Sequence, residues 1–426
     1  MTVGHRDKLV GLIRDFLRDS GLERTAAALE DEAAEHFDAN PIIPNVPLLR
    51  IFEEWATSTS TSDDLISTNG DLITARGGLA TTSVDLGCGG SSPQGPGDAK
   101  AAGWKGLSRT GLITPCPGKS LLFAKVFPGP LLLTAGTDKV IRAFRMDPVA
   151  ALDGNPPCEF LSVASPSTIL DFDLHGDTMI VACMDGSCLV VDFCSGRILQ
   201  TFSHHSKYLM KCLFCSKDGS LFSTASHDKT VNFYTIDRAA GFFVLTHTIS
   251  DLAGAVESLC WIKNPSTLVI GTRNDCRLHY VDLNDSAFAK STRNLNVNGD
   301  FYCSFTPMDI VPSPCEKFLL VYTDSESGRL IIVKSFADAK SYQASLYGPL
   351  VDGYSRPRCC WHSSGSYVFA NSDDNSVWVF DVASGRRIEK VDGFPAYIRS
   401  LSSVSCGSSG DVLLAACMDG SLNIRK

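Results

Sequence analysis

Residues 221–237 read LFSTASHDKTVNFYTID, and in this stretch two apolar runs lie on either side of Asp228. The runs are rich in β-branched and aromatic residues, which favour strands, and an Asp between them favours a tight turn. The stretch therefore predicts a β-hairpin. The neighbouring runs YLMKCLF (208–214) and GFFVLTHTI (241–249) extend this hairpin to a unit of four strands.

The same junction recurs along most of the chain. A turn Asp between two strand-like runs occurs seven times, at Asp138, Asp185, Asp228, Asp275, Asp324, Asp374 and Asp419. A period of about 47 residues built from short strands is typical of a β-propeller with four strands per blade. The hexapeptide Ala-Cys-Met-Asp-Gly-Ser occurs identically at 182–187 and 416–421, five repeats apart. We expect both copies to form the same turn.

These units resemble WD repeats, and the third unit shows the resemblance best. It keeps His205, a Ser or Thr within FSTAS (222–226), Asp228, and Tyr234 where the family has Trp. The Trp-Asp dipeptide itself is replaced, as at Val191-Asp192, Val281-Asp282 and Phe380-Asp381. The resemblance implies an all-β, seven-bladed β-propeller over residues 106–426, in which His205 and the seven turn Asp residues are structural.

The last unit has only three strand-like runs, because it stops at SLNIRK (421–426). An open ring would expose strand edges, which are aggregation-prone. We expect the missing fourth strand to come from residues 106–116, ahead of the first blade. Removal of this segment should then unfold the ring.

The N-terminal region has a different pattern. Residues 8–35 predict two amphipathic helices, with Gly21 ending the first. The stretch looks like a LisH motif, a two-helix dimerisation module, so a LisH-like helical hairpin is expected over residues 1–40. The resemblance implies a homodimer, and its expected dimerisation residues are Leu9, Leu12, Ile13, Phe16, Leu17, Ala26 and Leu29.

Two further segments separate this hairpin from the repeats. Residues 41–56 contain VPLLRIFEEW and predict an accessory amphipathic helix, either structural or a docking site. Residues 57–105 are rich in Gly, Ser, Thr and Pro and predict a flexible linker.

Composition excludes several function classes. The net charge is −9, with no cluster of Lys and Arg, which disfavours direct nucleic-acid binding. The sequence has no apolar run of membrane-spanning length, so a cytoplasmic or nuclear protein is expected, with no membrane partner. The 16 cysteines are interpreted mainly as buried thiols, and Cys212 and Cys215 lack a second ligand pair, so no metal site and no cofactor are expected.

The sequence lacks the common catalytic motifs, so we expect a non-catalytic dimeric scaffold that binds protein partners within a larger complex. The alternative is an enzyme or small-ligand binder that uses the central channel. Relatives with this arrangement act in ubiquitin-ligase complexes, microtubule or dynein regulation, and chromatin or RNA-processing complexes. In WD-repeat relatives the residues before the turn Asp often line the binding face, which here implies Thr137, Met184, His227, Asn274, Thr323, Asp373 and Met418, together with Tyr208 and Tyr397.

Overall fold

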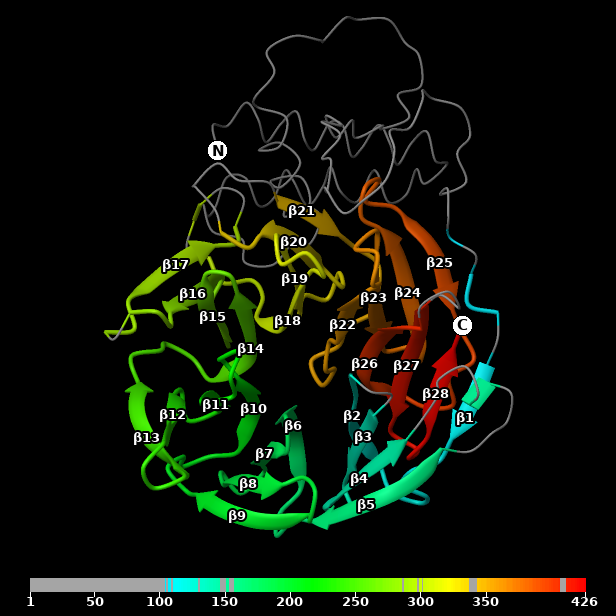
Figure 1. Ribbon diagram of the computed structural model, residues 1–426. Helices are drawn as coiled ribbons and strands as arrows, with labels where there is room; N and C mark the ends of the chain where they lie inside the picture. The colour runs from blue at the N-terminus through cyan, green and yellow to red at the C-terminus, as the bar shows by residue number, and fades with distance from the viewer. Residues whose placement is uncertain are drawn as a thin grey trace, which may run out of the picture. The chain divides into compact units, whose positions relative to one another are not determined.

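The computed structural model contains seven four-stranded antiparallel sheets arranged as blades around a central axis (Figure 1). It describes Trp104 and residues 106–108, 110–128, 131–145, 151–152, 157–285, 287–296, 299–300, 302–336, 343–406 and 411–426. These residues belong to the second of two compact units, Ala80–Lys426. The expected hairpin, accessory helix and most of the linker lie outside the described residues, as do all the expected dimerisation residues.

Blades 1 to 6 follow one plan, in which the first strand in sequence is innermost and the fourth is outermost (Figure 1). The strands of blades 1 to 3 are β2 (Leu121–Phe127), β3 (Leu131–Gly136), β4 (Val140–Arg145), β5 (Cys158–Ala164), β6 (Ile169–His175), β7 (Thr178–Cys183), β8 (Cys188–Asp192), β9 (Arg197–Phe202), β10 (Leu209–Phe214), β11 (Leu221–Ser226), β12 (Val231–Asp237) and β13 (Phe242–Ile249). Those of blades 4 to 6 are β14 (Val256–Lys263), β15 (Ser266–Thr272), β16 (Arg277–Asp282), β17 (Lys290–Asn294), β18 (Pro307–Pro312), β19 (Phe318–Thr323), β20 (Leu330–Lys334), β21 (Gln343–Leu346), β22 (Cys359–Trp361), β23 (Tyr367–Ser372), β24 (Ser376–Asp381) and β25 (Arg387–Val391).

Blade 7 is assembled from both ends of the described chain. It consists of β26 (Ile398–Ser405), β27 (Asp411–Cys417) and β28 (Leu422–Arg425), and its outer strand is β1 (Thr110–Ile113). Thr110 pairs with Arg425 and Ile113 pairs with Leu422 in an antiparallel register. The fourth strand of the last blade thus comes from the segment before blade 1, which closes the ring.

Trp104 extends this closure beyond β1. The sequence places Trp104 at the end of the linker, but its indole packs on blade 6, 5.0 Å from the Tyr367 ring and 5.9 Å from Phe369 between centroids. Its Nε1 donates a hydrogen bond of 2.5 Å to Glu389 Oε2. The propeller therefore begins before residue 106, because the aromatic side chain has a packed and hydrogen-bonded site there.

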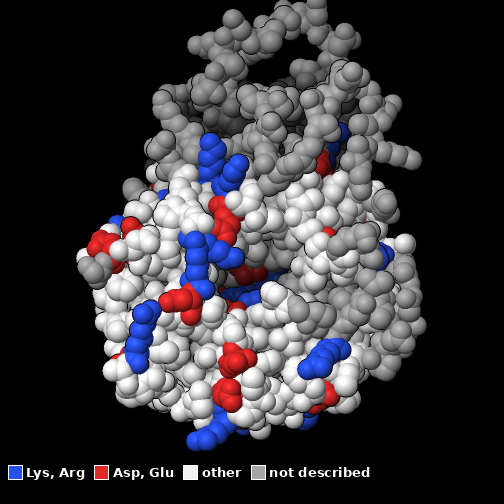
Figure 2. Space-filling model, viewed as in Figure 1, with Lys and Arg blue, Asp and Glu red and all other residues white. Residues whose placement is uncertain are grey.

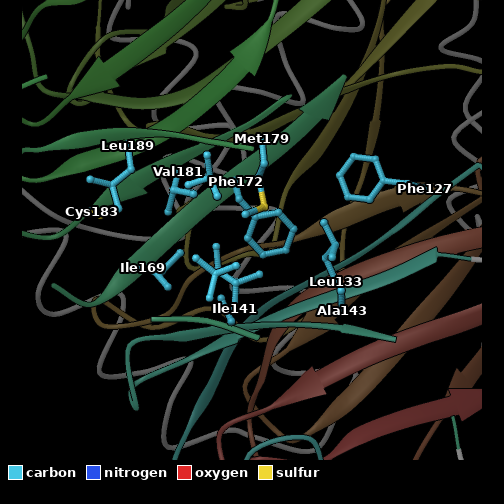
Figure 3. Close-up of a cluster of buried hydrophobic side chains, with 13 residues drawn as sticks. Phe127, Leu133, Ile141, Ala143, Ile169, Phe172, Met179, Val181, Cys183 and Leu189 are labelled. Atoms are coloured by element: carbon cyan, nitrogen blue, oxygen red, sulfur yellow. The ribbon is translucent and has the colours of Figure 1, made fainter. Parts of the chain in front are cut away.

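The hydrophobic core is divided among the junctions between blades. Each of seven buried clusters combines side chains from two neighbouring blades. Figure 3 shows the cluster between blades 1 and 2, where Ile141 and Leu133 from one blade lie near Phe172 and Met179 from the other. The second strand of a blade is buried on both faces, as in β23, whereas outer strands such as β9 are largely exposed. A single blade therefore has no core of its own.

In several blades, a side chain at one position of the inner strand forms a hydrogen bond to the next blade. This position follows a β-bulge, and its side chain reaches the backbone of the following inner strand. The bonds join Asp171 Oδ2 to Cys212 N (3.1 Å), Ser258 Oγ to Pro307 O (2.8 Å), Asp309 Oδ2 to Cys359 N (3.2 Å), and Ser400 Oγ to Ala124 O (3.1 Å). In blade 1 the position is Phe123, whose ring packs edge-on against Phe172 of blade 2 at 4.9 Å.

Loss of the Trp104 contact should destabilise the whole ring. Trp104→Ala removes an aromatic side chain that packs on blade 6, and we expect it to lower the free energy of unfolding by about 2–4 kcal/mol. Chemical denaturation measures this change. Leu112→Ala is the matched control, because Leu112 lies in β1 with its side chain exposed, and it should stay within about 0.5 kcal/mol of wild type. Equal stability of Trp104→Ala and Leu112→Ala would contradict a closing role for Trp104.

Candidate functional site

Seven residues occupy one equivalent position around the ring. Each lies at the turn between the second and third strands of its blade and donates its backbone N–H to the carbonyl of a residue in the chain leading into the inner strand of the same blade. The donor-to-acceptor distances run from 2.7 to 3.2 Å. We call this set the turn face; its members are Thr137, Met184, His227, Arg273, Asp324, Asp373 and Met418.

In blades 4 and 5 the turn-face position is held by a residue other than the expected one. In blade 4 the position is held by Arg273, because the chain turns at Asn274, whose φ of 56° is left-handed, before it reaches Asp275. In blade 5 the turn is longer, and Thr323 is the last residue of β19. Thr323 is buried and its hydroxyl donates to Arg329 O at 2.8 Å. Thr323 is therefore a buried turn residue, and the half-buried Asp324 takes the equivalent position on the turn face.

The turn Asp carboxylates mostly stabilise their own turns. Five of these carboxylates each accept a hydrogen bond from the backbone N–H two residues ahead. They are those of Asp138, Asp185, Asp228, Asp275 and Asp419. Asp374 accepts instead from the Ser376 hydroxyl and pairs with Lys390 Nζ at 2.8 Å. Asp324 differs, since its carboxylate accepts from Thr306 N at 2.5 Å, at the start of its own blade. Six of the seven turns thus follow the expected role, and the seventh carboxylate fixes the incoming chain.

The repeated hexapeptide forms the same turn twice. Gly186 and Gly420 have φ values of 88° and 87°, and Asp185 and Asp419 each bind the following Ser at the same two distances, 3.0 Å to N and 2.6 Å to Oγ. A Cβ on Gly420 would lie 2.0 Å from Cys116 O, and one on Gly186 would lie 2.8 Å from Lys207 O. Both carbonyl oxygens belong to the chain that leads into the next blade. Glycine is needed here because that chain passes against the turn.

His205 is the centre of a buried network in blade 3. Its Nδ1 lies 3.1 Å from Asp228 Oδ2 and 3.0 Å from Thr230 Oγ1, and its Nε2 lies 2.8 Å from Thr224 Oγ1. The hydroxyl in FSTAS that takes part is therefore that of Thr224. Tyr234, at the position of the family Trp, is buried and stacks on Phe222 at 4.7 Å. Burial raises the pKa of Tyr234 to about 12.

The exposed side chains on this side of the ring are partly apolar. Met184 is 56% exposed and Met418 is 45% exposed. Tyr208 and His227 stack on each other with ring centroids 4.7 Å apart. Tyr397 is more constrained, because its hydroxyl accepts from Arg356 N at 2.7 Å and from Asn371 Nδ2 at 3.2 Å. Tyr397 therefore holds the chain leading into blade 6.

Sequence reasoning missed the loop between β21 and β22. Within it Tyr354 is 96% exposed and Leu350 is also exposed, yet the backbone is held firmly. Asp352 Oδ1 accepts from Tyr354 N at 2.8 Å, and Asp352 N donates to Asp373 Oδ2 of the turn face at 2.7 Å. An available signal was the length of the segment YGPLVDGYSRPR (347–358), which has no strand pattern of its own.

The cysteines include one cluster that the sequence did not suggest. Three side chains that could bind a metal ion lie together, each with one possible ligand atom within 4.8 Å of the others. They are Asp275, Cys276 and Cys303. Asp275 is already engaged by Arg277 and by His279 Nε2 at 2.9 Å, and burial raises the pKa of Cys276 to about 11. Cys212 and Cys215 are both buried, and burial raises the pKa of Cys215 to about 12.

Comparison with known proteins agrees with this geometry. Residues 196–235, which include His205, Asp228 and Tyr234, match the WD40 family, described as "WD domain, G-beta repeat". The match and the seven-bladed ring support a WD-repeat protein.

A pre-mRNA-processing factor 19 from Oryza sativa subsp. japonica is similar to part of the chain, with 27% identity over 145 residues. The similarity covers 34% of this chain and 27% of that protein. Among the described residues, no helix is long and apolar enough to cross a membrane.

The His205 network should make folding stability depend on pH. Burial lowers the pKa of His205 below 6.5, against a smaller opposing effect of Asp228. The unfolded chain then binds a proton more readily than the folded protein, so stability falls as pH drops below the unfolded pKa. His205→Gln keeps two hydrogen-bonding ends but cannot protonate. We expect the free energy of unfolding of this variant to be about 1–3 kcal/mol below that of wild type near neutral pH. On further acidification, the free energy of unfolding should fall less in the variant than in wild type.

Denaturation curves at about pH 8 and about pH 5.5 measure the difference between the two proteins. His175→Gln is the control, since His175 is a partly exposed histidine on β6 outside the network. Parallel pH profiles for wild type and His205→Gln would contradict the assignment.

Proposed function

We propose that this chain is a non-catalytic scaffold that binds protein partners through the turn face and the adjoining loop 347–358. The observation that carries the proposal is the exposure of Met184, Met418, Leu350 and Tyr354 on this side of the ring. Large apolar side chains exposed on rigid loops favour protein interfaces, in which Met and Tyr are common anchors. The backbone hydrogen bonds of Tyr354 and Asp352 supply that rigidity.

We further propose that the chain self-associates through the helices expected in residues 1–40. The support is the apolar pattern of Leu9, Ile13 and Phe16 and the need of so short a hairpin for a partner. A dimer would present two turn faces on one particle. Two linked sites strengthen binding on the order of a hundredfold or more when both are reached at once.

The biological setting that we propose is an RNA-processing complex. Among the settings implied by the WD-repeat resemblance, this one fits the similarity to a pre-mRNA-processing factor. Of the two expected locations, the nucleus suits that setting. The similarity covers 27% of the relative, so it supports the propeller-based interaction role and not the other parts of that protein.

A second candidate function is small-ligand binding in the central channel. The observation that favours it is the charge on and next to the inner strands, where Lys211 and Arg358 pair with Asp309 and where Glu257 is buried.

Charged substitutions on the turn face should remove partner binding. Met184→Glu with Met418→Glu places two charges at the expected interface without touching the core, because both side chains are exposed. Affinity capture from the source cells, followed by quantitative mass spectrometry, should show at least a tenfold loss of co-purifying partners. Leu199→Glu is the matched control, since Leu199 is 54% exposed on the outer strand β9, away from the turn face. Partners retained by the double variant, or lost equally in the control, would refute this interface.

Disruption of the apolar N-terminal pattern should produce monomers. Ile13→Asp with Phe16→Asp places two charges in the expected dimer interface, where they would be buried at high cost. Multi-angle light scattering should give the monomer mass for the variant and the dimer mass for wild type. The control is Arg14→Asp with Arg18→Asp on the polar side of the same predicted helix, which should remain dimeric. A dimeric Ile13/Phe16 variant, or a monomeric wild type, would rule out self-association through these residues.

A further inference from the structure

Three arginines approach the central channel from the last two blades. Arg356 and Arg358 lie in the chain leading into β22, and Arg399 lies at the start of β26. Arg356 reaches across to blade 3, where its Nη2 lies 3.3 Å from Met210 Sδ of β10. Figure 2 shows basic and acidic side chains together in the hollow at the centre of the ring. Arg356 and Arg399 are both partly exposed, so the hollow is accessible to a ligand.

The carboxylates of the channel leave two of these three arginines without an ion pair among the described residues. Glu257 forms an ion pair with Arg273, in which Oε1 lies 2.8 Å from Nη2. Arg358 Nη1 pairs with Asp309 Oδ1 at 3.2 Å, and Lys211 Nζ lies 3.9 Å from the same oxygen. Within the described part of the chain, neither Arg356 nor Arg399 forms an ion pair with a carboxylate.

Hydrogen-bonding capacity in the cluster is also unused. Nε of Arg358 and Nε of Arg399 are both buried and have no hydrogen-bond partner among the described residues. The contact of Arg356 with Met210 Sδ is a poor substitute, because a thioether is a weak acceptor. Buried donors without partners destabilise the folded state, so a bound acceptor would recover stability.

The electrostatic setting favours an anion. Burial, together with the charges of Arg358 and Arg399, lowers the pKa of Arg356 to about 10. Burial and the charge of Arg358 likewise lower the pKa of Arg399. The guanidinium groups nevertheless remain protonated at neutral pH, so like charges are held together in a partly buried site. A counter-ion would relieve this repulsion.

We propose that the mouth of the central channel is a binding site for a phosphate group, with Arg356, Arg358 and Arg399 as its donors. Two guanidinium groups lack a carboxylate, and a phosphomonoester carries close to two negative charges, so the charges match. Guanidinium groups also bind phosphate oxygens through paired N–H donors. A single carboxylate would leave one positive charge and some donors unused. The site does not depend on the proposed scaffold function.

The phosphate can come from a free ligand or from a phosphorylated side chain of a partner, and calorimetric titration of the full chain distinguishes the two. The probes are inorganic pyrophosphate and a phosphoserine peptide, with the unphosphorylated peptide and sodium chloride at equal ionic strength as blanks. Wild type should bind at least one phosphate probe saturably. Arg399→Gln and Arg356→Gln should each weaken binding at least tenfold. Arg238→Gln, which removes the same charge from an exposed arginine of blade 3, should bind as wild type does.

Each outcome bears on the site directly. Tighter binding of pyrophosphate assigns a free ligand, and tighter binding of the phosphopeptide assigns a partner-borne group. Arg399→Lys keeps the charge but loses the paired donors, so it should retain intermediate affinity, and it replaces Arg399→Gln if that variant fails to fold. The phosphate probe should also raise the melting temperature of wild type saturably. Absence of saturable binding, or equal affinity in Arg399→Gln and Arg238→Gln, would overturn the proposal.

Discussion

Each blade of this propeller is held by its neighbours more than by itself. The second strands are buried on both faces, and every hydrophobic cluster is shared between two blades. The bulged position of the inner strand adds a directed bond to the next blade, as from Asp171 to Cys212 N and from Ser400 to Ala124 O. Because each blade is stabilised only by its neighbours, a blade at an open end of the ring would lack one of its two stabilising contacts. Closure by β1 on β28, with Trp104 on blade 6, is therefore a condition for the other six junctions.

The same constraint separates the structural residues from those free to vary. Turn carboxylates such as those of Asp185 and Asp419 form their hydrogen bonds inside the turn. The neighbouring Gly lets the chain that leads into the next blade pass against the turn. The residues just before them, Met184 and Met418, contribute their backbone N–H and keep their side chains exposed. These two side chains can change without harm to the ring, which suits them to recognition. At Asp373 the side chain also holds the incoming chain, because its Oδ2 accepts from Asp352 N.

The sequence predicted the parts of the fold that are local. The spacing of the turn Asp residues gave seven blades, and His205 could be paired with Asp228 because both belong to one repeat. The register failed at Asn274 and Thr323, since the turn Asp of blades 4 and 5 is displaced by one residue from the equivalent backbone position.

Contacts between blades could not be predicted in this way. Arg356 meets Met210, and Trp104 meets Glu389, across long separations in sequence. A repeat pattern shows which residues are equivalent, but it does not show which residues face each other across the ring. The exposed Tyr354 loop was missed for a related reason, since its fixed geometry depends on Asp373 in the following hairpin.

Hydrogen–deuterium exchange of the captured complex, compared with the free chain, tests the partner-binding role of the turn face most directly. We predict that partner binding slows exchange in peptides covering 181–187, 347–358 and 415–421, which carry Met184, Tyr354 and Met418. Peptides from the outer strands β5, β9 and β13 should exchange at unchanged rates. Protection confined to those outer strands, with no change at the turn face, would contradict the account.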